Sequence, residues 1–315
     1  MDRVHVSFLE PERWIPPGEL KAASRTSGTA YAATAVLLGD NEVGPAVLLL
    51  SVPPGITPPD APAHGHASDN FRISLRGALP MGSEVYRQGE FRLQRGWKPY
   101  RSDNYAHGPD GGWTFLLFAD RRGMKVRHVS KDSPSHEVQD RKLAEWLGIK
   151  GDLISDDPQD TSGPSTLVTD LGPLKANHFN GSFAESHRWP QAGPQTRAAG
   201  ALMGDPVCGP VLVMATTTAN GQSAPERTFD TEVLHLIVGG SCTVGDYVYV
   251  SGDLMVVPAG VRSAPVIAGP DGVQELIVLG DRRGVVPDAG EHSWLGEVNR
   301  LLTDLLEESR RLAQV

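Results

Sequence analysis

The sequence contains few cysteines and no long apolar run. Only Cys208 and Cys242 occur among its 315 residues, which excludes a disulfide framework or a site built from several cysteine ligands. No stretch approaches the roughly 18 consecutive apolar residues of a transmembrane helix. The first residues include Asp2, Arg3 and Glu10 where a secretory signal would be apolar, so we expect a cytoplasmic protein.

Clusters of basic residues are also absent. The 29 Lys and Arg residues are scattered along the chain and outnumbered by 38 Asp and Glu, which gives a formal net charge of −9 at pH 7. Nucleic-acid-binding proteins gather positive charge on one face, and helices that lie on membranes are usually rich in Lys and Arg. We therefore expect neither nucleic acid nor a membrane as a partner.

Glycine and proline are abundant instead, with 35 and 25 residues. This composition is typical of many short strands joined by turns. The hydrophobic fraction of 39% is enough for ordinary cores, and the chain length suggests two domains. The composition therefore favours a mainly β fold in two domains.

A duplication supports this organisation. Residues 108–123 read GPDGGWTFLLFADRRG and residues 269–284 read GPDGVQELIVLGDRRG, with eight of sixteen positions identical. Self-similarity at a fixed spacing indicates an internal repeat. Short apolar or alternating segments between turn residues predict strands at 31–38, 46–52, 71–75, 84–86, 91–93 and 113–118 in the first repeat, and at 233–238, 247–250, 254–257 and 275–279 in the second.

The repeat divides the chain into four parts. We expect an N-terminal β domain with an extension over 1–130, a connector over 131–196, a second β domain over 197–285 and an amphipathic helix over 286–315. The helix is predicted from apolar residues such as Leu301 and Leu305, which recur at helical spacing.

The first repeat contains a pair of histidines in a characteristic setting. Residues 63–77 read AHGHASDNFRISLRG, and residues 89–96 read GEFRLQRG. They resemble the two motifs of the cupin superfamily: His-x-His followed by Glu and Gly, and then Gly, Pro-x-Gly and His. Gly252, Pro258 and Gly260 match the second motif in the second repeat. The chain thus resembles a bicupin over about 30–123 and 200–284, which implies two double-stranded β-helix (jelly-roll) barrels.

The cupin resemblance also implies a divalent metal ion held by three histidines and one glutamate. His64 and His66 match the first two ligands, Asn70 stands at the glutamate position, and His107 is the nearest histidine to the last position. We therefore expect iron, manganese, nickel or zinc at His64, His66, Asn70 and His107. In the opposing interpretation, the histidine pair remains from a metal-binding ancestor and binds no ion.

The second repeat has no histidine at the motif positions. They hold Glu226, Thr228, Glu232 and Ser263. We therefore expect the active site in the N-terminal barrel, with the C-terminal barrel serving structure and assembly.

Arg72 and Tyr100 are the candidate catalytic residues. Arg72 shares a strand face with Asn70, because the two are two residues apart. If Asn70 faces the interior, Arg72 is suited to bind a carboxylate or phosphate. The alternation of Phe71 and Ile73 favours the opposite register, with Arg72 in solvent. Tyr100 is near the last motif position and is a candidate proton donor or acceptor.

Three functions are consistent with these residues. The leading one is a small-molecule enzyme with metal-assisted oxygenase or lyase/isomerase chemistry on an organic acid or aromatic compound. A metal-free ligand-binding or regulatory bicupin is the alternative from another class, and metal-free acid–base catalysis is the third. The substrate is expected to be a small molecule such as a carboxylate. The cupin resemblance and the leucine-rich C-terminal stripe together predict a homodimer.

Overall fold

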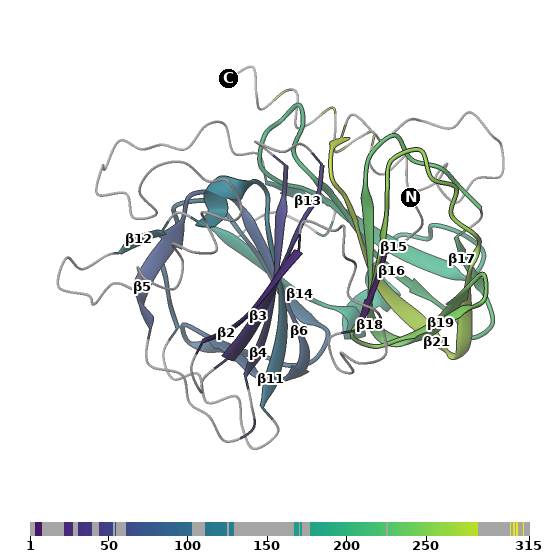
Figure 1. Cartoon of the computed structure of the whole chain (residues 1–315), viewed down its shortest axis with the longest axis horizontal. Helices are drawn as coiled ribbons and strands as arrows, with labels where there is room; N and C mark the ends of the chain where they lie inside the picture. The colour runs from purple at the N-terminus through teal and green to yellow at the C-terminus, as the bar shows by residue number, and fades with distance from the viewer. Residues whose placement is uncertain are drawn as a thin grey trace. The chain divides into compact units, whose positions relative to one another are not determined.

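The computed structural model describes residues 4–7, 22–27, 31–39, 44–52, 54, 61–102, 111–124, 126–128, 167–169, 171, 177–224 and 226–282, together with residues 303, 305, 307 and 311. The described strands form two units (Figure 1). One unit, the N-terminal barrel, comprises Lys21–Ser165 and Lys175–Gly181. The other, the C-terminal barrel, comprises Met1–Leu20, Thr166–Leu174 and Ser182–Val315. This grouping assigns the first strand of the chain to the C-terminal barrel.

The N-terminal barrel is built from two main sheets and a hairpin. Its seven-stranded sheet has the order β14-β9-β6-β11-β4-β3-β2, and its three-stranded sheet has the order β10-β5-β12. The large sheet contains β2 (Ala22–Ser27), β3 (Tyr31–Leu37), β4 (Ala46–Val52), β6 (Asn70–Gly77), β9 (Glu90–Gln94), β11 (Gly112–Phe118) and β14 (His178–Ser182). The small sheet contains β5 (Ala61–His66), β10 (Tyr100–Ser102) and β12 (Val126–His128), and the hairpin pairs β7 (Leu79–Met81) with β8 (Glu84–Tyr86). A short 3-10 helix, η2 (Arg121–Met124), follows β11.

Strand β6 is buried on both faces. Phe71 and Ile73 are on one face, where the Phe71 ring contacts those of Phe91 and Phe115. Arg72 is on the other face and is only 6% exposed. The alternation of apolar residues therefore identifies one buried face of β6, but it does not mean that the other face is exposed to solvent. Of the two registers that the sequence leaves open, the one with Arg72 in solvent is wrong, because the second face of this strand is covered as well.

The C-terminal barrel is one continuous nine-stranded sheet. Its main path is β1-β20-β18-β21-β16-β15-β13, with β17 paired to β21 and β19 paired to β18. The strands are β1 (Val4–Ser7), β13 (Val168–Thr169), β15 (Thr196–Leu202), β16 (Val211–Thr217), β17 (Gln222–Ala224), β18 (Val233–Val244), β19 (Tyr247–Val250), β20 (Asp253–Val257) and β21 (Val266–Leu279). A 3-10 helix, η3 (Phe183–Arg188), precedes β15. Strand β1 pairs antiparallel with β20, from Val4 opposite Val256 to Ser7 opposite Asp253.

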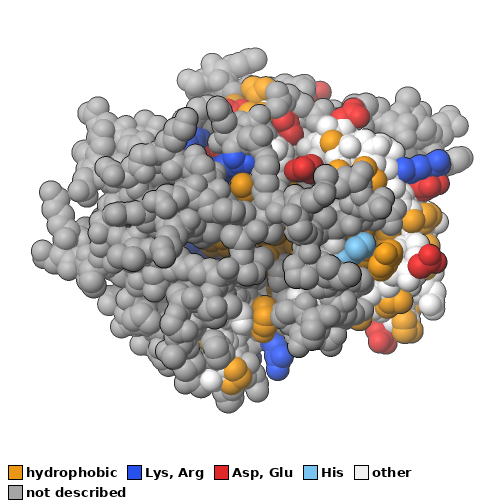
Figure 2. Space-filling view, in the orientation of Figure 1, with side chains coloured by type: hydrophobic (Ala, Val, Ile, Leu, Met, Phe, Trp, Pro, Cys, Tyr) orange, Lys and Arg blue, Asp and Glu red, His pale blue; other side chains and the backbone are white. Residues whose placement is uncertain are grey.

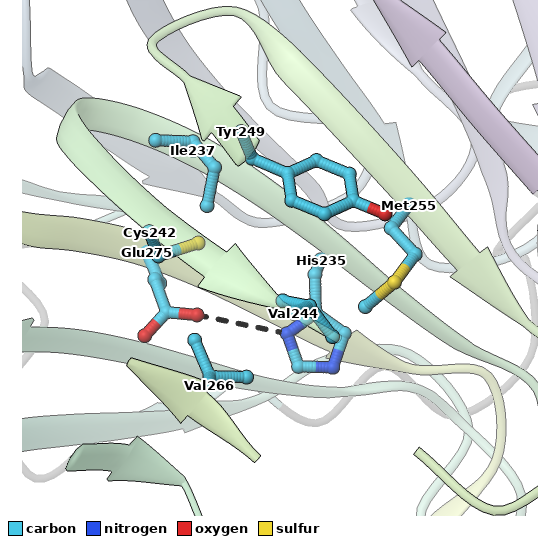
Figure 3. A pocket seen from close by; sticks show the side chains of 8 residues that line it. All are labelled: His235, Ile237, Cys242, Val244, Tyr249, Met255, Val266 and Glu275. Atoms are coloured by element: carbon cyan, nitrogen blue, oxygen red, sulfur yellow. Dashed lines mark ion pairs between the residues drawn. The ribbon is translucent and has the colours of Figure 1, made fainter. Parts of the chain in front are cut away.

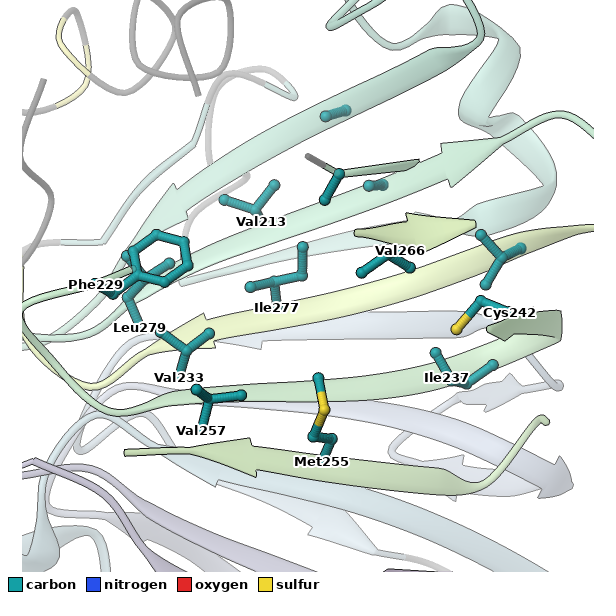
Figure 4. Close-up of a cluster of buried hydrophobic side chains, with 14 of the residues drawn as sticks. Val213, Phe229, Val233, Ile237, Cys242, Met255, Val257, Val266, Ile277 and Leu279 are labelled. Atoms are coloured by element: carbon teal, nitrogen blue, oxygen red, sulfur yellow. The ribbon is translucent and has the colours of Figure 1, made fainter. Parts of the chain in front are cut away.

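Apolar side chains from these strands fill the C-terminal barrel (Figure 4). Val213, Met255 and Ile277 come from β16, β20 and β21 and are at most 2% exposed. Leu305, one of four helical residues described near the end of the chain, packs into the same core. The rest of the predicted helix over 286–315 falls outside the described residues. The mainly β fold in two antiparallel units is confirmed.

Two further features concern the surface. Among the described residues, no helix is long and apolar enough to cross a membrane. On the face seen in Figure 2, described acidic, basic and apolar side chains are interspersed.

Candidate active site

Four of the predicted site residues meet at one atom, the hydroxyl oxygen of Tyr100. His64 and His66 are on β5, and Tyr100 opens β10 directly opposite His64. Residues opposite each other in antiparallel strands share a face, and so do residues two apart on one strand. Arg72 reaches the same oxygen from β6. The two sheets of the N-terminal barrel thus bring these side chains together.

The contacts at this oxygen are close. It lies 2.8 Å from His64 Nε2 and 3.0 Å from His66 Nε2. Arg72 Nη2 donates a hydrogen bond to it, and the guanidinium carbon lies 4.1 Å from the centre of the Tyr100 ring. Tyr100, Arg72 and His66 are each less than one-tenth exposed. Polar contacts in such surroundings are stronger than the same contacts in water.

Gly65 separates the two histidines and permits close packing. A Cβ atom at this position would lie 3.0 Å from the carbonyl carbon of Trp97 and 3.3 Å from that of Lys98. The Trp97 amide donates a hydrogen bond of 2.6 Å to the His66 carbonyl. Glycine therefore lets the segment before β10 lie directly against β5, which positions Tyr100 beside both imidazoles.

The His66 ring is held from its other side. Its Nδ1 lies 2.7 Å from the carbonyl oxygen of Gly123 in η2, and the Phe118 ring packs 4.8 Å from it, centre to centre. A carbonyl only accepts, so Nδ1 carries the proton and the Nε2 of neutral His66 is an acceptor. This contact points a basic nitrogen at the Tyr100 hydroxyl.

The hydrogen-bonding capacity of the phenol then assigns the remaining protons. Arg72 only donates, so the Tyr100 oxygen accepts from it. The Tyr100 O–H donates to His66 Nε2, and the second lone pair accepts from His64 Nε2–H. Two N–H donors stabilise negative charge on the oxygen while His66 is placed to take its proton. The arrangement is suited to proton transfer.

Two buried polar residues of β9 join this interior and were missed from the sequence. In the β6–β9 ladder, Arg92 lies directly opposite Arg72, and Gln94 lies directly opposite Asn70. Arg92 is 9% exposed and Gln94 is 1% exposed. Their residue types alone do not distinguish them from solvated strand residues. The feature that identifies Arg92 and Gln94 is their pairing with Arg72 and Asn70. This pairing is known only once the register of β9 against β6 is known.

Of the other two predicted metal ligands, the structure describes only Asn70. Asn70 is on the Arg72 face of β6, and the Oδ1 of its neighbour Asp69 accepts a hydrogen bond from the Gly96 amide at 2.9 Å. His107 lies outside the described residues. Within the described ranges, no group of three or more His, Cys, Asp or Glu side chains is placed to hold a metal ion.

The donor set at the point of convergence is also unsuited to a divalent ion. A phenol occupies that point, and the guanidinium of Arg72 touches the same oxygen. A fixed positive charge there opposes a second one. These residues do not fit the expected ion, so no chemical step below involves a metal.

Two of the motif positions of the second repeat, Glu226 and Ser263, differ in burial. Glu226 is exposed and forms an ion pair of 2.8 Å with Arg262. Ser263 is buried, and its backbone pairs with that of Arg227.

A chain of polar side chains lies inside the C-terminal barrel, and Figure 3 shows two of its members, His235 and Glu275. Arg227 Nη2 lies 3.3 Å from His235 Nε2, His235 Nδ1 lies 3.8 Å from Glu275 Oε1, and Ser223 Oγ donates to Glu275 Oε2. All four side chains are buried. His235 and Glu275 border a small cavity whose other walls are mostly apolar. The sequence analysis missed this chain because its members are on three elements and in the loop between β17 and β18.

Burial and the neighbouring charges shift the pKa values of Glu275 and Arg227 in opposite directions. Burial by itself raises the pKa of Glu275, but contacts with His235, Ser223 and Arg227 outweigh it and lower that pKa below 4.5. Burial lowers the pKa of Arg227 to about 10, against the opposing effect of Glu275. Burial also raises the pKa of the Cys242 thiol. The barrel therefore encloses an ionised Arg–Glu pair bridged by His235, and an unreactive thiol.

Comparison with known proteins returned likeness of structure only. No protein-family model matches the chain, and no curated protein matches its sequence. A candidate dioxygenase from Nostoc punctiforme is similar in structure with a TM-score of 0.49 and 12% identity, covering 89% of this chain and 83% of its own. Vicilin from Corylus avellana gives a TM-score of 0.45 and 11% identity, with 84% of each chain covered.

A variant of Bacillus subtilis oxalate decarboxylase gives a TM-score of 0.45 and 14% identity, covering 88% of this chain and 77% of its own. Another structure of that enzyme is described by its Mn(II) centres. Similarity at this level carries no information about the activity of the present chain. The resemblance to bicupins is therefore one of duplicated β architecture and of the motifs around His64 and His66.

Proposed function

We propose that the N-terminal barrel is the active site of an enzyme that moves a proton on a small organic acid, as a lyase or isomerase does. The observation that carries the proposal is the single phenol oxygen of Tyr100, which is contacted by two imidazole nitrogens and a guanidinium inside the barrel. Buried polar groups are costly unless they are paired, and sets of this kind are frequent at catalytic sites.

Each residue has a chemical role in this proposal. Tyr100 is the proton donor or acceptor, and His66, oriented by the Gly123 carbonyl, exchanges the proton with it. His64 and Arg72 stabilise negative charge on the phenol oxygen. Arg72 also provides the fork that binds a carboxylate, because its Nη1 donates to the Met81 sulfur at 3.1 Å and has no charged partner among the described residues. Of the reaction classes expected from the sequence, lyase and isomerase chemistry requires no more than these proton transfers.

The alternative is a bicupin that binds an anion without changing it. Arg72 would serve both functions, whereas the Tyr100–His66 contact is required only for catalysis. Replacement of Tyr100 therefore separates the two proposals.

The test is hydrogen exchange at carbon in D2O, followed by proton NMR. The untagged full chain is incubated with short carboxylic, hydroxy and keto acids, and we expect loss of the C–H signal next to the carboxylate of at least one. Tyr100→Phe should slow the exchange by about 100-fold or more, within the range of general acid–base catalysis. Tyr247→Phe, at a half-exposed tyrosine of the other barrel, is the control and should exchange at the parent rate.

Two results would contradict the proposal. If the parent exchanges none of the acids but binds them, the barrel is a binding module. If Tyr100→Phe exchanges as fast as the parent, the phenol is not the proton carrier. A parallel incubation with a chelator should leave the exchange rate unchanged. If the chelator abolishes exchange and an added divalent ion restores it, the metal-assisted hypothesis is favoured again.

A further inference from the structure

The interior of the N-terminal barrel has two facing rungs of polar side chains. In the β6–β9 ladder, the amides of Asn70 and Gln94 form one rung, and the guanidinium groups of Arg72 and Arg92 form the next. Directly opposed residues have Cβ atoms about 4.5–5.5 Å apart and share a face. Both arginines are more than nine-tenths buried.

Two like charges in this position need a negative partner. Like charges directly opposite each other in a sheet are destabilising, and burial increases the repulsion. Arg72 contacts the Tyr100 hydroxyl and the Met81 sulfur, both uncharged groups. Among the described residues, no carboxylate forms an ion pair with Arg72 or Arg92. Within the described part of the chain, the positive charge of these two arginines is therefore unbalanced.

Arg92, the second arginine of this pair, also has an unused hydrogen-bond donor among the described residues. Arg92 Nε is fully buried and has no hydrogen-bond partner among the described residues. Arg92 lies beside the Tyr86 hydroxyl, whose pKa is raised by burial and partly lowered again by the Arg92 charge. Glu84, which also acts on the Tyr86 hydroxyl, is exposed, and its Oε2 accepts from Asn180 Nδ2 at 2.7 Å. It does not balance the arginines from within the barrel.

Gln94 adds an acceptor next to the two donors. Its Nε2 donates to the Lys98 carbonyl at 2.5 Å, and its Oε1 is buried with no hydrogen-bond partner in the described structure. A ligand that satisfies this interior would offer negative charge to the arginines and a hydroxyl proton to Gln94. The two rungs therefore specify the ligand more narrowly than one arginine does.

We propose that the N-terminal barrel takes a dianion, with one anionic group on Arg72 beside Tyr100 and the second on Arg92 beside Tyr86. The class is a short dicarboxylic acid with a hydroxyl group that donates to Gln94 Oε1. The spacing of the rung limits the two anionic groups to carbons at most a few bonds apart. This assignment rests on the proposed function in placing the reacting acid at Arg72, and it adds Arg92 and Gln94 as residues that determine specificity.

Calorimetric titration of the full chain with four probes tests the assignment. The probes are acetate, malonate, hydroxymalonate and inorganic phosphate, each at neutral pH and low salt. We expect malonate to bind about tenfold or more tighter than acetate, since its second carboxylate adds a charge-assisted hydrogen bond with Arg92. Hydroxymalonate should bind tighter still. Phosphate binding tighter than either dicarboxylate would overturn the dicarboxylate assignment in favour of a phosphate ester.

Variants test whether Arg92 causes the preference for malonate over acetate. Arg92→Gln should remove the preference for malonate and leave acetate affinity within about twofold, and Arg92→Lys should retain part of the preference. Gln94→Leu should remove only the advantage of hydroxymalonate. Arg76→Gln, at an exposed arginine of the same strand, is the matched control and should bind as the parent does.

Unfolding measurements distinguish a ligand group from a structural one. Because Arg92 adds unbalanced charge, Arg92→Gln without ligand should unfold at the parent temperature or above it. A lower unfolding temperature together with parental malonate affinity would overturn the proposal, as would a parent that binds malonate no better than acetate. Binding is measured here without turnover. A protein that prefers dianions but exchanges no hydrogen would retain this site and refute only the catalytic proposal.

Discussion

Two glycines, Gly65 and Gly123, position the side chains around the Tyr100 hydroxyl. The Gly123 carbonyl determines which nitrogen of His66 is basic, and Gly65 lets the chain before β10 approach β5. Neither glycine takes part in the proposed chemistry. Both act by leaving space that a side chain would occupy.

Gly123 supports a direct test of this positioning. A Cβ atom there would lie 2.4 Å from Cγ of Phe118, whose ring packs on His66. Gly123→Ala should therefore displace the ring, destabilise the protein by about 1–3 kcal/mol through overpacking and slow the D2O exchange. Gly193→Ala is the control, because a Cβ there makes only an ordinary contact at 3.7 Å. Denaturant unfolding of both variants measures the cost, and equal values for the two would contradict the positioning role.

The site residues were only partly predictable from the sequence. The motif spacing marks His64 and His66 directly. Arg72 was found because it is two residues after the motif position of Asn70, and Tyr100 because it is near the last motif position. Whether Arg72 faces inward could not be decided, because the apolar alternation of β6 implied an outer face in solvent. Arg92 and Gln94 could not be found at all, since their place depends on the β9 register.

Among the elements, strands with a regular apolar pattern were predicted well and strands without one were not. The prediction at 46–52 coincides with β4, and that at 113–118 differs from β11 by one residue. Strand β5, which carries both histidines, was not predicted. Its sequence, APAHGH, has no apolar alternation and contains Pro62 and Gly65, two residues that weaken strands. Pairing with β10 and β12 makes it a strand.

The polar chain that joins β17, β18 and β21 predicts a pH-dependent stability. The lowered pKa of Glu275 stabilises the fold above about pH 4.5, the ordinary value for the group. This contribution is lost as the pH falls below that value and the carboxylate takes up a proton. Chemical unfolding between pH 3 and 7 should therefore show stability declining at the acid end.

Glu275→Gln tests the source of that decline. It keeps an oxygen for Ser223 but leaves Arg227 buried without its counter-charge, so we expect a loss of about 3 kcal/mol at pH 7. The acid slope should also be shallower than in the parent. Glu226→Gln, at an exposed ion pair, is the control and should change stability by less than about 1 kcal/mol. A parental acid slope in Glu275→Gln would show that other carboxylates cause the decline.

For the whole molecule, the homodimer predicted from the sequence is still a prediction. The C-terminal barrel presents Tyr247, Val248 and Ile267 as exposed apolar side chains, and Thr243 on β18 is opposite both Val248 and Ile267. Light scattering after size-exclusion chromatography should give twice the 33.8 kDa chain mass at micromolar concentration. A mass of one chain would refute the prediction.

The pairing of β1 with β20 has a consequence for how the protein is made. Val4 is synthesised 252 residues before its partner Val256 (256 minus 4). The edge of β20 cannot be covered until the whole first barrel and connector have been translated. Strand β1 must therefore stay unpaired until β20 has been translated, so a bulky fusion directly before β1 would hinder completion of the C-terminal barrel.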